Sequence, residues 1–248
     1  MARRMTLEGA KVKAVCELMP YSGGLARNMK QCLEDFDIPL LLSHTVVEIH
    51  GKDRVSGVTI AKVDENRKPL EETRQYISCD TLLLSVGLIP ENELSKCAGI
   101  GLDRITNGAV VDQDRATEID GIFACGNVLH VHDLVDYVSE EGERAGASAA
   151  RFLRNHAQER EEIAVTAGIG VRYVVPQAIH AAGGDVSLSL RVARPFAGAK
   201  LVVRSRENVL VALKRPKMAP GEMEKITLRK EQLQGVAGMI RVEVEGAE

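Results

Sequence analysis

The sequence is poor in aromatic side chains and contains no tryptophan. Phe and Tyr make up 3% of its 248 residues, too few to build the stacking surface that holds single-stranded nucleic acid. The net charge is −3 and the basic residues are dispersed, which argues against binding to a phosphate backbone. No apolar run approaches the roughly 20 residues that a membrane helix needs. We therefore expect neither a nucleic-acid partner nor a membrane span.

A Cys-x-x-Cys pair is also missing, and the N-terminus carries two arginines without the apolar stretch of a secretory signal. An odd and scattered set of cysteines indicates reduced thiols, as expected for a cytoplasmic protein. The same spacing argues against a redox-active dithiol and against a zinc site. The five cysteines are Cys16, Cys32, Cys79, Cys97 and Cys125.

The third missing feature is a glycine-rich dinucleotide loop. Residues 2–8 have helical composition, Gly9 stands where a glycine would end that helix, and residues 11–17 have the pattern of a strand that ends in Glu17. This order is the middle of a βαβ unit, without the first strand and the Gly-x-Gly-x-x-Gly loop that should precede it. We therefore expect a missing N-terminal half, or a partner flavoprotein subunit, to complete the fold in an oligomer or complex.

Residues 18–155 contain further α/β elements. Apolar runs predict strands, turn residues separate them, and small residues within the last segment allow a closely packed helix. Residues 80–87 are a near-continuous apolar run, typical of a strand buried on both faces. The expected elements are helices over residues 25–36 and 135–155, strands over 38–42, 45–50, 80–87, 108–111 and 121–124, and a hairpin of residues 54–63 and 72–77.

Beyond the charged linker 158–162 the pattern changes to short strands separated by Gly and Pro. Residues 186–192 alternate between apolar and polar, the period of a half-buried strand. Several short strands bounded by turns indicate a small antiparallel β-sandwich. The expected strands are residues 171–175, 186–192, 200–204, 209–214, 222–228 and 239–244.

Two motifs carry a resemblance to a known family. Residues 80–92 read DTLLLSVGLIPEN and residues 117–127 read TEIDGIFACGN. In this order they resemble the FAD-dependent pyridine nucleotide-disulfide oxidoreductases. The first resembles the strand and turn that lead from the NAD(P) domain back to the FAD domain, and the second resembles the second FAD motif. The resemblance covers roughly residues 1–155 and implies FAD and NAD(P)H as cofactors.

The second motif implies contacts with the ribityl chain of FAD. Gly126 lets the backbone come close, and Asn127 stands where the family usually has an Asp that accepts from a ribityl hydroxyl. The uncharged amide of Asn127 can still accept, though more weakly. The resemblance also implies that backbone groups of Leu134 and Val135, at the start of the next helix, point at the flavin pyrimidine ring. The alternative is a tight packing point between a strand and a loop.

Two further residues are candidates for binding the pyridine nucleotide. Glu17 stands where an acid at the end of the second strand accepts from the adenosine ribose and repels a 2′-phosphate, which favours NAD over NADP. Gly87 stands where the family's chain passes near the nicotinamide. The alternatives are an exposed glutamate at a strand end and a glycine needed for packing.

The loop before the last helix contains His130, His132 and Asp133. These residues could ligate a metal, or a histidine could donate a proton near the flavin. We interpret them instead as pocket-lining or solvated residues and predict no metal. Cys125 is interpreted as a small apolar filler, and no catalytic residue is identified.

Together these features predict an α/β protein: a partial doubly wound, Rossmann-like FAD/NAD(P)-binding fold followed by a small antiparallel β-sandwich. The expected domains are an incomplete NAD(P)-binding domain (1–88), the C-terminal segment of an FAD-binding domain (89–156) and the sandwich (157–248). The expected function is hydride transfer from NAD(P)H, NADH by preference, to FAD and on to an acceptor. The alternative is a cofactor-free binding or assembly subunit derived from such an enzyme. The resemblance implies an assembly role for the C-terminal domain, as in similar chains that accompany a glycerol-3-phosphate-dehydrogenase-like flavoprotein.

Overall fold

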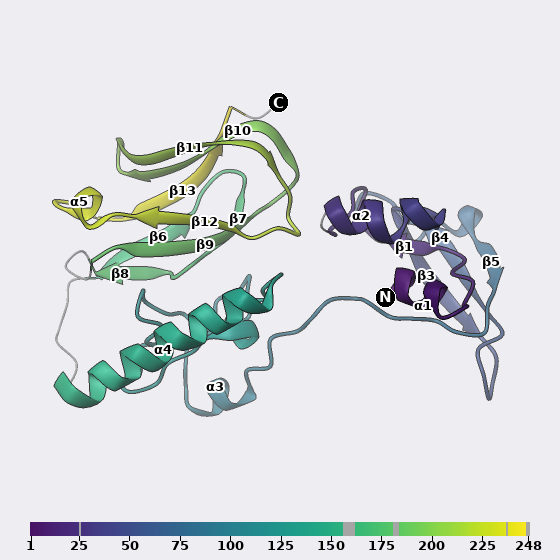
Figure 1. Ribbon diagram of the computed structural model, residues 1–248, viewed down its shortest axis with the longest axis horizontal. Helices are drawn as coiled ribbons and strands as arrows, with labels where there is room; N and C mark the ends of the chain where they lie inside the picture. Colours follow the sequence, from purple (N-terminus) through teal and green to yellow (C-terminus); the bar gives the residue numbers. More distant parts are fainter. Residues whose placement is uncertain (25, 156–161, 181–183, 237, 247–248) are drawn as a thin grey trace. The chain divides into compact units, whose positions relative to one another are not determined.

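The computed structural model describes residues 1–24, 26–155, 162–180, 184–236 and 238–246 (Figure 1). It divides into two compact units, residues 1–87 (unit 1) and residues 88–248 (unit 2). Unit 2 contains both the expected FAD-domain segment and the expected sandwich, and the three-domain division stays a prediction. In the described residues no helix is long and apolar enough to cross a membrane.

Unit 1 contains the expected βα connection. Strand β1 (Val15–Glu17) pairs in parallel with β2 (Leu40–Leu42). A parallel pair needs a crossover connection, and α2 (Ala26–Cys32) lies in that connection. The other strands form a three-stranded antiparallel sheet in the order β3-β4-β5. The remaining elements of unit 1 are α1 (Ala2–Leu7), β3 (His44–His50), β4 (Gly57–Lys62), β5 (Gln75–Ser78) and short 3₁₀ turns at Glu34–Phe36 and Glu71–Thr73.

Most expected elements of unit 1 are present with shorter bounds. Gly9 has a φ of 92°, the left-handed conformation in which glycine commonly ends a helix. Strand β1 covers only the end of the expected strand 11–17, because β2 offers just three pairing partners. The expected helix 25–36 ends at Cys32 and continues as a 3₁₀ turn, and its first residue, Leu25, lies outside the described residues.

The strand expected over residues 80–87 does not form. These residues have no regular secondary structure, and Leu84 and Val86 are 71% and 91% exposed. A strand buried on both faces needs hydrogen-bonded neighbours on its edges, and no described strand pairs with this segment. The segment therefore has the composition of a buried strand, but several of its apolar side chains are exposed in this chain.

Unit 2 consists of one long helix, irregular turns and two packed sheets. Helix α4 (Val135–Asn155) has the predicted bounds. The larger sheet has the order β11-β10-β13-β6-β8 and the smaller one β12-β9-β7 (Figure 1). The elements are α3 (Glu93–Cys97), a 3₁₀ turn at Gly126–Val128, β6 (Glu162–Ala167), β7 (Val171–Val175), β8 (Ala178–His180), β9 (Val186–Val192), β10 (Phe196–Ser205), β11 (Asn208–Met218), β12 (Glu224–Leu228), α5 (Lys230–Leu233) and β13 (Ile240–Glu245).

The β-sandwich of unit 2 confirms the predicted β-rich C-terminal part. The apolar residues of β9 are fully buried, as the period-2 pattern predicts. One pair of strands, β13 and β6, is parallel, so the sandwich is not purely antiparallel. Strands β6 and β8 were not expected. Strand β6 begins at the end of the predicted charged linker, of which residues 158–161 lie outside the described residues.

Residues 100–129 pack against the sandwich through a second, smaller core. Val111 and Leu129 are buried together with Tyr173 and Val175 of β7. The backbone N–H of Val111 also donates to Oε1 of Gln177 at 3.1 Å. The sandwich thus supports the loop region that contains the expected flavin motif.

The two short strands expected over residues 108–111 and 121–124 are reduced to isolated bridges. Leu102 pairs with Ala109, and Ala116 pairs with Phe123. The residues between them form tight turns, such as the bond from Arg115 N–H to the carbonyl of Asp112 at 3.0 Å. Each apolar run is too short and too closely followed by a turn to extend its pairing.

Candidate functional site

Glu141 of α4 is the centre of a buried polar cluster. Its side chain is 4% exposed. One carboxylate oxygen accepts from Arg115 Nε at 3.0 Å and contacts His130 Nε2 at 3.2 Å. The other accepts from the backbone N–H of Gly126 at 2.7 Å and contacts His132 Nε2 at 3.0 Å. A buried carboxylate needs such partners. Here Gly126, His130 and His132 belong to the loop at the end of the flavin motif, and Arg115 comes from the turn before that motif.

The position of Glu141 follows from the periodicity of α4. Glu141, Ala145 and Ser148 are the buried residues of this helix, and they are four and three residues apart, on one helical face. An acid in an otherwise small and apolar face is therefore the sequence signal for this cluster. Glu141 and Arg115 were not among the residues predicted for the site, because both lie outside the loop and the helix start that resemble the family.

Arg115 is held in place by a tight turn. It has a φ of 64°, and the carboxylate of Asp112 accepts from the backbone N–H groups of Asp114 at 2.8 Å and Ala116 at 3.0 Å. Such Asx turns fix the backbone locally. Arg115 follows Val111, which packs on the sandwich, so its guanidinium is directed inward from a supported segment.

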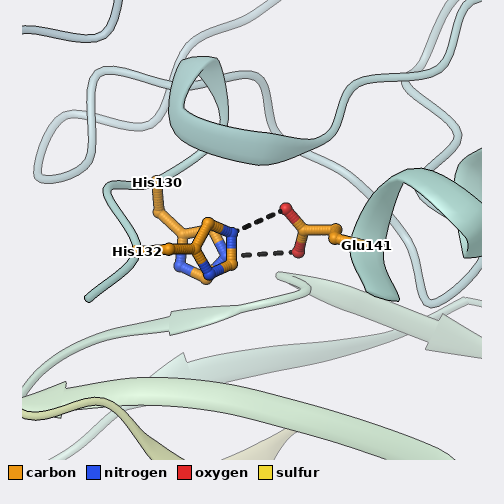
Figure 2. A group of neighbouring side chains, drawn as sticks. All are labelled: His130, His132 and Glu141. Carbon is orange, nitrogen blue, oxygen red and sulfur yellow. Dashed lines mark hydrogen bonds and ion pairs between the residues drawn. The ribbon is translucent and has the colours of Figure 1, made fainter. Parts of the chain in front are cut away.

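His130 and His132 lie side by side and face the carboxylate of Glu141. Their ring centroids are 4.4 Å apart, and Figure 2 shows both rings turned toward the carboxylate. Burial lowers the pKa of His130 and outweighs its interaction with Glu141. Burial would raise the pKa of Glu141, but the bonds to the histidines and the charge of Arg115 outweigh it and hold that pKa well below its usual range. Glu141 is therefore ionised and His130 neutral at neutral pH.

The same three side chains, His130, His132 and Glu141, are close enough to surround a metal ion. Both carboxylate oxygens are, however, already hydrogen-bonded, and the positive guanidinium of Arg115 lies 3.0 Å from one of them. A divalent cation here would be repelled by that charge and would displace these bonds. The physical argument thus favours an ion pair, and the expected absence of a metal stays a prediction.

The four residues of the predicted flavin contact in unit 2 lie around one loop. Gly126 is buried with a φ of 76°. Asn127 is exposed, and its amide oxygen accepts from the backbone N–H of His132 at 3.1 Å. Leu134 and Val135 are 39% and 74% exposed at the start of α4. Their contacts with a cofactor stay a prediction.

The loop fits the predicted cofactor contact in its hydrogen-bonding capacity. The Asn127 amide nitrogen has no acceptor among the described residues, so it can donate to a hydroxyl of a ligand. The first backbone N–H groups of α4 have no intrahelical partners either, as in every helix. Donors are therefore presented on the exposed side of the loop, while Glu141 holds its buried side.

The sandwich fixes this loop through Arg191 of β9. The Arg191 guanidinium donates to the carbonyl of Val131 at 3.0 Å, to Asp133 at 3.4 Å and to the hydroxyl of Tyr173 at 3.1 Å. Asp133 also accepts from the backbone N–H of Met223 at 3.2 Å. The β-rich domain thus holds the segment between Asn127 and α4.

Glu17 and Gly87 belong to unit 1 and are described separately. Glu17 ends β1, and its carboxylate accepts from the backbone N–H of Met19 at 3.0 Å. Gly87 is exposed with a φ of 105°, and no atom lies within 4 Å of the position a β-carbon would take. The positive φ explains glycine at this position, and neither predicted nucleotide contact is tested.

Cys125 precedes this loop and is half-buried. Burial, with a smaller contribution from the charge of Glu141, raises the pKa of its thiol. A raised pKa keeps the thiol protonated and unreactive, in agreement with its interpretation as a packing residue.

Comparisons with known proteins agree with the resemblance seen in the motifs. The chain is 30% identical over 141 residues to the mitochondrial dihydrolipoyl dehydrogenase of Caenorhabditis elegans, covering 54% of this chain and 27% of that protein. It is 35% identical over 88 residues to the ferredoxin–NAD(+) reductase subunit of the benzene 1,2-dioxygenase system of Pseudomonas putida, covering 36% of this chain and 20% of that protein. The chain therefore spans only a small part of the length of these relatives.

The chain is also similar to parts of two solved structures. The thioredoxin reductase of T. acidophilum is 25% identical with a TM-score of 0.50, covering 57% of this chain and 45% of that one. The thioredoxin reductase of Lactococcus lactis, 19% identical with a TM-score of 0.51 over 60% of this chain and 48% of that one, shares the fold. The family model described as pyridine nucleotide-disulphide oxidoreductase matches residues 7–149. With more than half of its length matched, the chain belongs to the pyridine nucleotide-disulphide oxidoreductase family.

Proposed function

We propose that this protein is part of a flavin-dependent oxidoreductase that transfers hydride from NADH to FAD and on to an acceptor. The observation that carries the proposal is the loop 126–135. Glu141 holds its buried side through Gly126, while Asn127 and the start of α4 present donors on the exposed side. The family match over residues 7–149 supports the same cofactor pair.

In this proposal the flavin supplies the hydride-accepting chemistry, and the chain supplies binding and orientation. The amide of Asn127 binds a ribityl hydroxyl. The N–H groups near Leu134 and Val135 face the pyrimidine ring, where the helix dipole favours negative charge. Arg191 and Glu141 keep the loop in one conformation from two sides, which lowers the entropic cost of binding.

Preference for NADH over NADPH is proposed from Glu17. A carboxylate at the end of β1 accepts from ribose hydroxyls and repels the phosphate of NADPH. Its single bond to the N–H of Met19 leaves one oxygen available. We further propose that the protein works in the cytoplasm, since its cysteines are all free thiols.

The second candidate is a cofactor-free assembly subunit derived from such an enzyme. It is favoured by one observation: the backbone N–H of Gly126 and the Nε2 atoms of His130 and His132 are already paired within the chain, through Glu141, while Nδ1 of each histidine has no partner among the described residues. A loop held in this way needs no cofactor to order it. The β-sandwich then serves as the docking domain for a flavoprotein partner.

The two candidates are separated by the effect of Asn127→Ala on the flavin content of the protein as the cell makes it. The chromosomal gene receives a C-terminal affinity tag, and the protein is purified together with any subunit that accompanies it. The proposal predicts one FAD per chain, released on denaturation and identified by its absorbance and mass. A colourless preparation without a flavin-carrying subunit would contradict the enzyme assignment. An Asn127→Ala variant should retain less FAD, whereas the control Asn107→Ala should retain the normal amount.

A further inference from the structure

Unit 2 contains a small polar cavity that the proposed flavin contact does not use. Its volume is about 30 Å³, and residues of α4, β9 and β12 contribute to its lining. A space of this size holds roughly two water molecules or one small ion. The donors in its lining are Arg115, His132, Tyr137, Arg144, Ser187, Ser189 and Lys225.

Arg115 has a buried donor that no described residue satisfies. Its Nε is bonded to Glu141, but its Nη1 is buried and has no hydrogen-bond partner among the described residues. The side chain is 4% exposed. A buried charged donor without an acceptor is unfavourable, so an acceptor is expected at this position.

A second guanidinium, that of Arg144, adds positive charge to the lining of the cavity. Arg144 lies three residues after Glu141 on α4, lines the same cavity, and forms no ion pair with a described residue. Burial lowers the pKa of Arg115, and the positive charge of Arg144 lowers it further. The two cations therefore repel each other across the cavity.

The carboxylates in the lining are already committed to other partners. Glu141 is bonded to Arg115, Gly126 and the two histidines. Glu140 pairs with Lys225 at 2.6 Å. The lining thus contains three cations and two carboxylates, an excess of one positive charge; outside the lining, the carboxylate of Asp112 also acts on Arg115. The hydroxyls of Ser187 and Ser189 can rotate to donate into the cavity.

We propose that this cavity binds one small monovalent anion, of the size of chloride or nitrate, between Arg115, Arg144 and the two serine hydroxyls. The anion accepts from the unpaired Arg115 Nη1 and reduces the repulsion between the two guanidiniums. Its charge matches the one excess positive charge of the lining. The two charges of a dianion such as sulfate would exceed the one excess positive charge of the lining. Because Arg115 also holds Glu141, the bound anion stabilises the cluster beneath the loop at Gly126.

The test is the thermal unfolding of the full chain in gluconate buffer at constant ionic strength, with chloride or nitrate replacing gluconate. An anion that binds only the folded state raises the unfolding temperature with a saturable dependence on its concentration. We expect this rise with chloride and nitrate and not with sulfate. Arg144→Gln should remove the saturable part. The control Arg154→Gln, exposed on the same helix, should keep it.

A crystal soaked in bromide gives an independent readout, since bromide replaces chloride and scatters anomalously. The proposal predicts an anomalous peak beside Arg115 Nη1 that is missing in Arg144→Gln crystals. No saturable rise, an equal rise with sulfate, or an equal rise in Arg144→Gln would overturn it. None of these outcomes depends on flavin binding, so the anion site and the proposed function stand or fall separately.

Discussion

The carboxylate of Glu141 accepts a hydrogen bond from the backbone N–H of Gly126 at 2.7 Å, which joins the second turn of α4 to the loop of the flavin motif. The same carboxylate is paired with Arg115 and with His130 and His132, as Figure 2 shows. One side chain thus fixes the loop, the turn at Arg115 and the helix relative to one another, and its removal should affect all three.

The substitution Glu141→Gln should destabilise unit 2 strongly. Glutamine has an amide nitrogen that cannot accept a bond, whereas all the partners of Glu141 are donors or face it with nitrogen. Arg115 would keep a buried charge without its counter-ion, which costs about 3–5 kcal/mol. Urea unfolding measures the loss. The exposed neighbour Glu143 provides the control, and Glu143→Gln should change stability by less than about 0.5 kcal/mol. Equal effects at both positions would show that the cluster contributes nothing.

The stability of unit 2 should fall on mild acidification because of His130. Its pKa in the folded protein lies below the ordinary value of 6.5, so the unfolded chain takes up a proton first. The stabilisation is complete above pH 6.5 and is lost as the pH falls from there toward the folded pKa, by at most about 1.4 kcal/mol per pH unit. The contribution of Glu141, whose pKa is depressed, is lost only in stronger acid, below its ordinary value of 4.5.

This pH dependence is measured by urea unfolding at a series of pH values. His130→Gln keeps a donor for Glu141 but cannot be protonated, and it should flatten the slope just below neutrality. His44→Gln, in unit 1 and outside the cluster, should leave the slope unchanged. If the pH dependence of the unfolding free energy persists in His130→Gln, it arises from the protonation of another group.

The substitution Gly126→Ala should destabilise the protein, whereas Gly146→Ala should stabilise it. At Gly126 the φ is 76°, and a β-carbon would lie 3.4 Å from Val138 Cγ1. A left-handed conformation costs a residue with a β-carbon about 1–2 kcal/mol. Gly146, inside α4, has no atom within 4 Å of a β-carbon, and Gly146→Ala should stabilise by about 0.5–1 kcal/mol. Thermal unfolding of the two variants should therefore shift in opposite directions; shifts of the same sign would contradict the loop conformation.

Arg191→Ala should loosen the loop from the sandwich. The variant loses the bonds to Val131, Asp133 and Tyr173 and leaves Asp133 half-paired, at a cost of about 3 kcal/mol. Hydrogen exchange should become faster at the backbone amides of residues 131–134. Arg172→Ala removes an exposed arginine of β7. It should change neither the free energy of unfolding nor the exchange rates of these amides. Unchanged exchange in Arg191→Ala would mean that the sandwich does not hold the loop.

The elements that the sequence predicted well are those whose pattern is local. Helix α4 and strand β9 have the predicted bounds, because their periodicities extend over several turns or residue pairs. The run 80–87 has the composition of a buried strand but is exposed, since strand formation depends on distant neighbours that composition does not report. The strands predicted over residues 108–111 and 121–124 do not form for a related reason, because each apolar run is short and lies between turns.

The site was predicted only in part for the same physical reason. Gly126, Asn127, Leu134 and Val135 follow from a contiguous motif, and they do lie around one loop. Glu141 and Arg115 are 26 residues apart and meet only in the folded chain. His130 and His132 were interpreted as pocket-lining or solvated residues; the solvated alternative is wrong, because both side chains are buried against Glu141.

The most direct test of the proposed function is the anaerobic reduction of the flavin by NADH in the protein purified from its own cells through a C-terminal tag. The account predicts that NADH bleaches the visible flavin absorbance stoichiometrically and faster than NADPH does, and that Glu17→Ala narrows this difference. A flavin that NADH and NADPH both leave oxidised would contradict it.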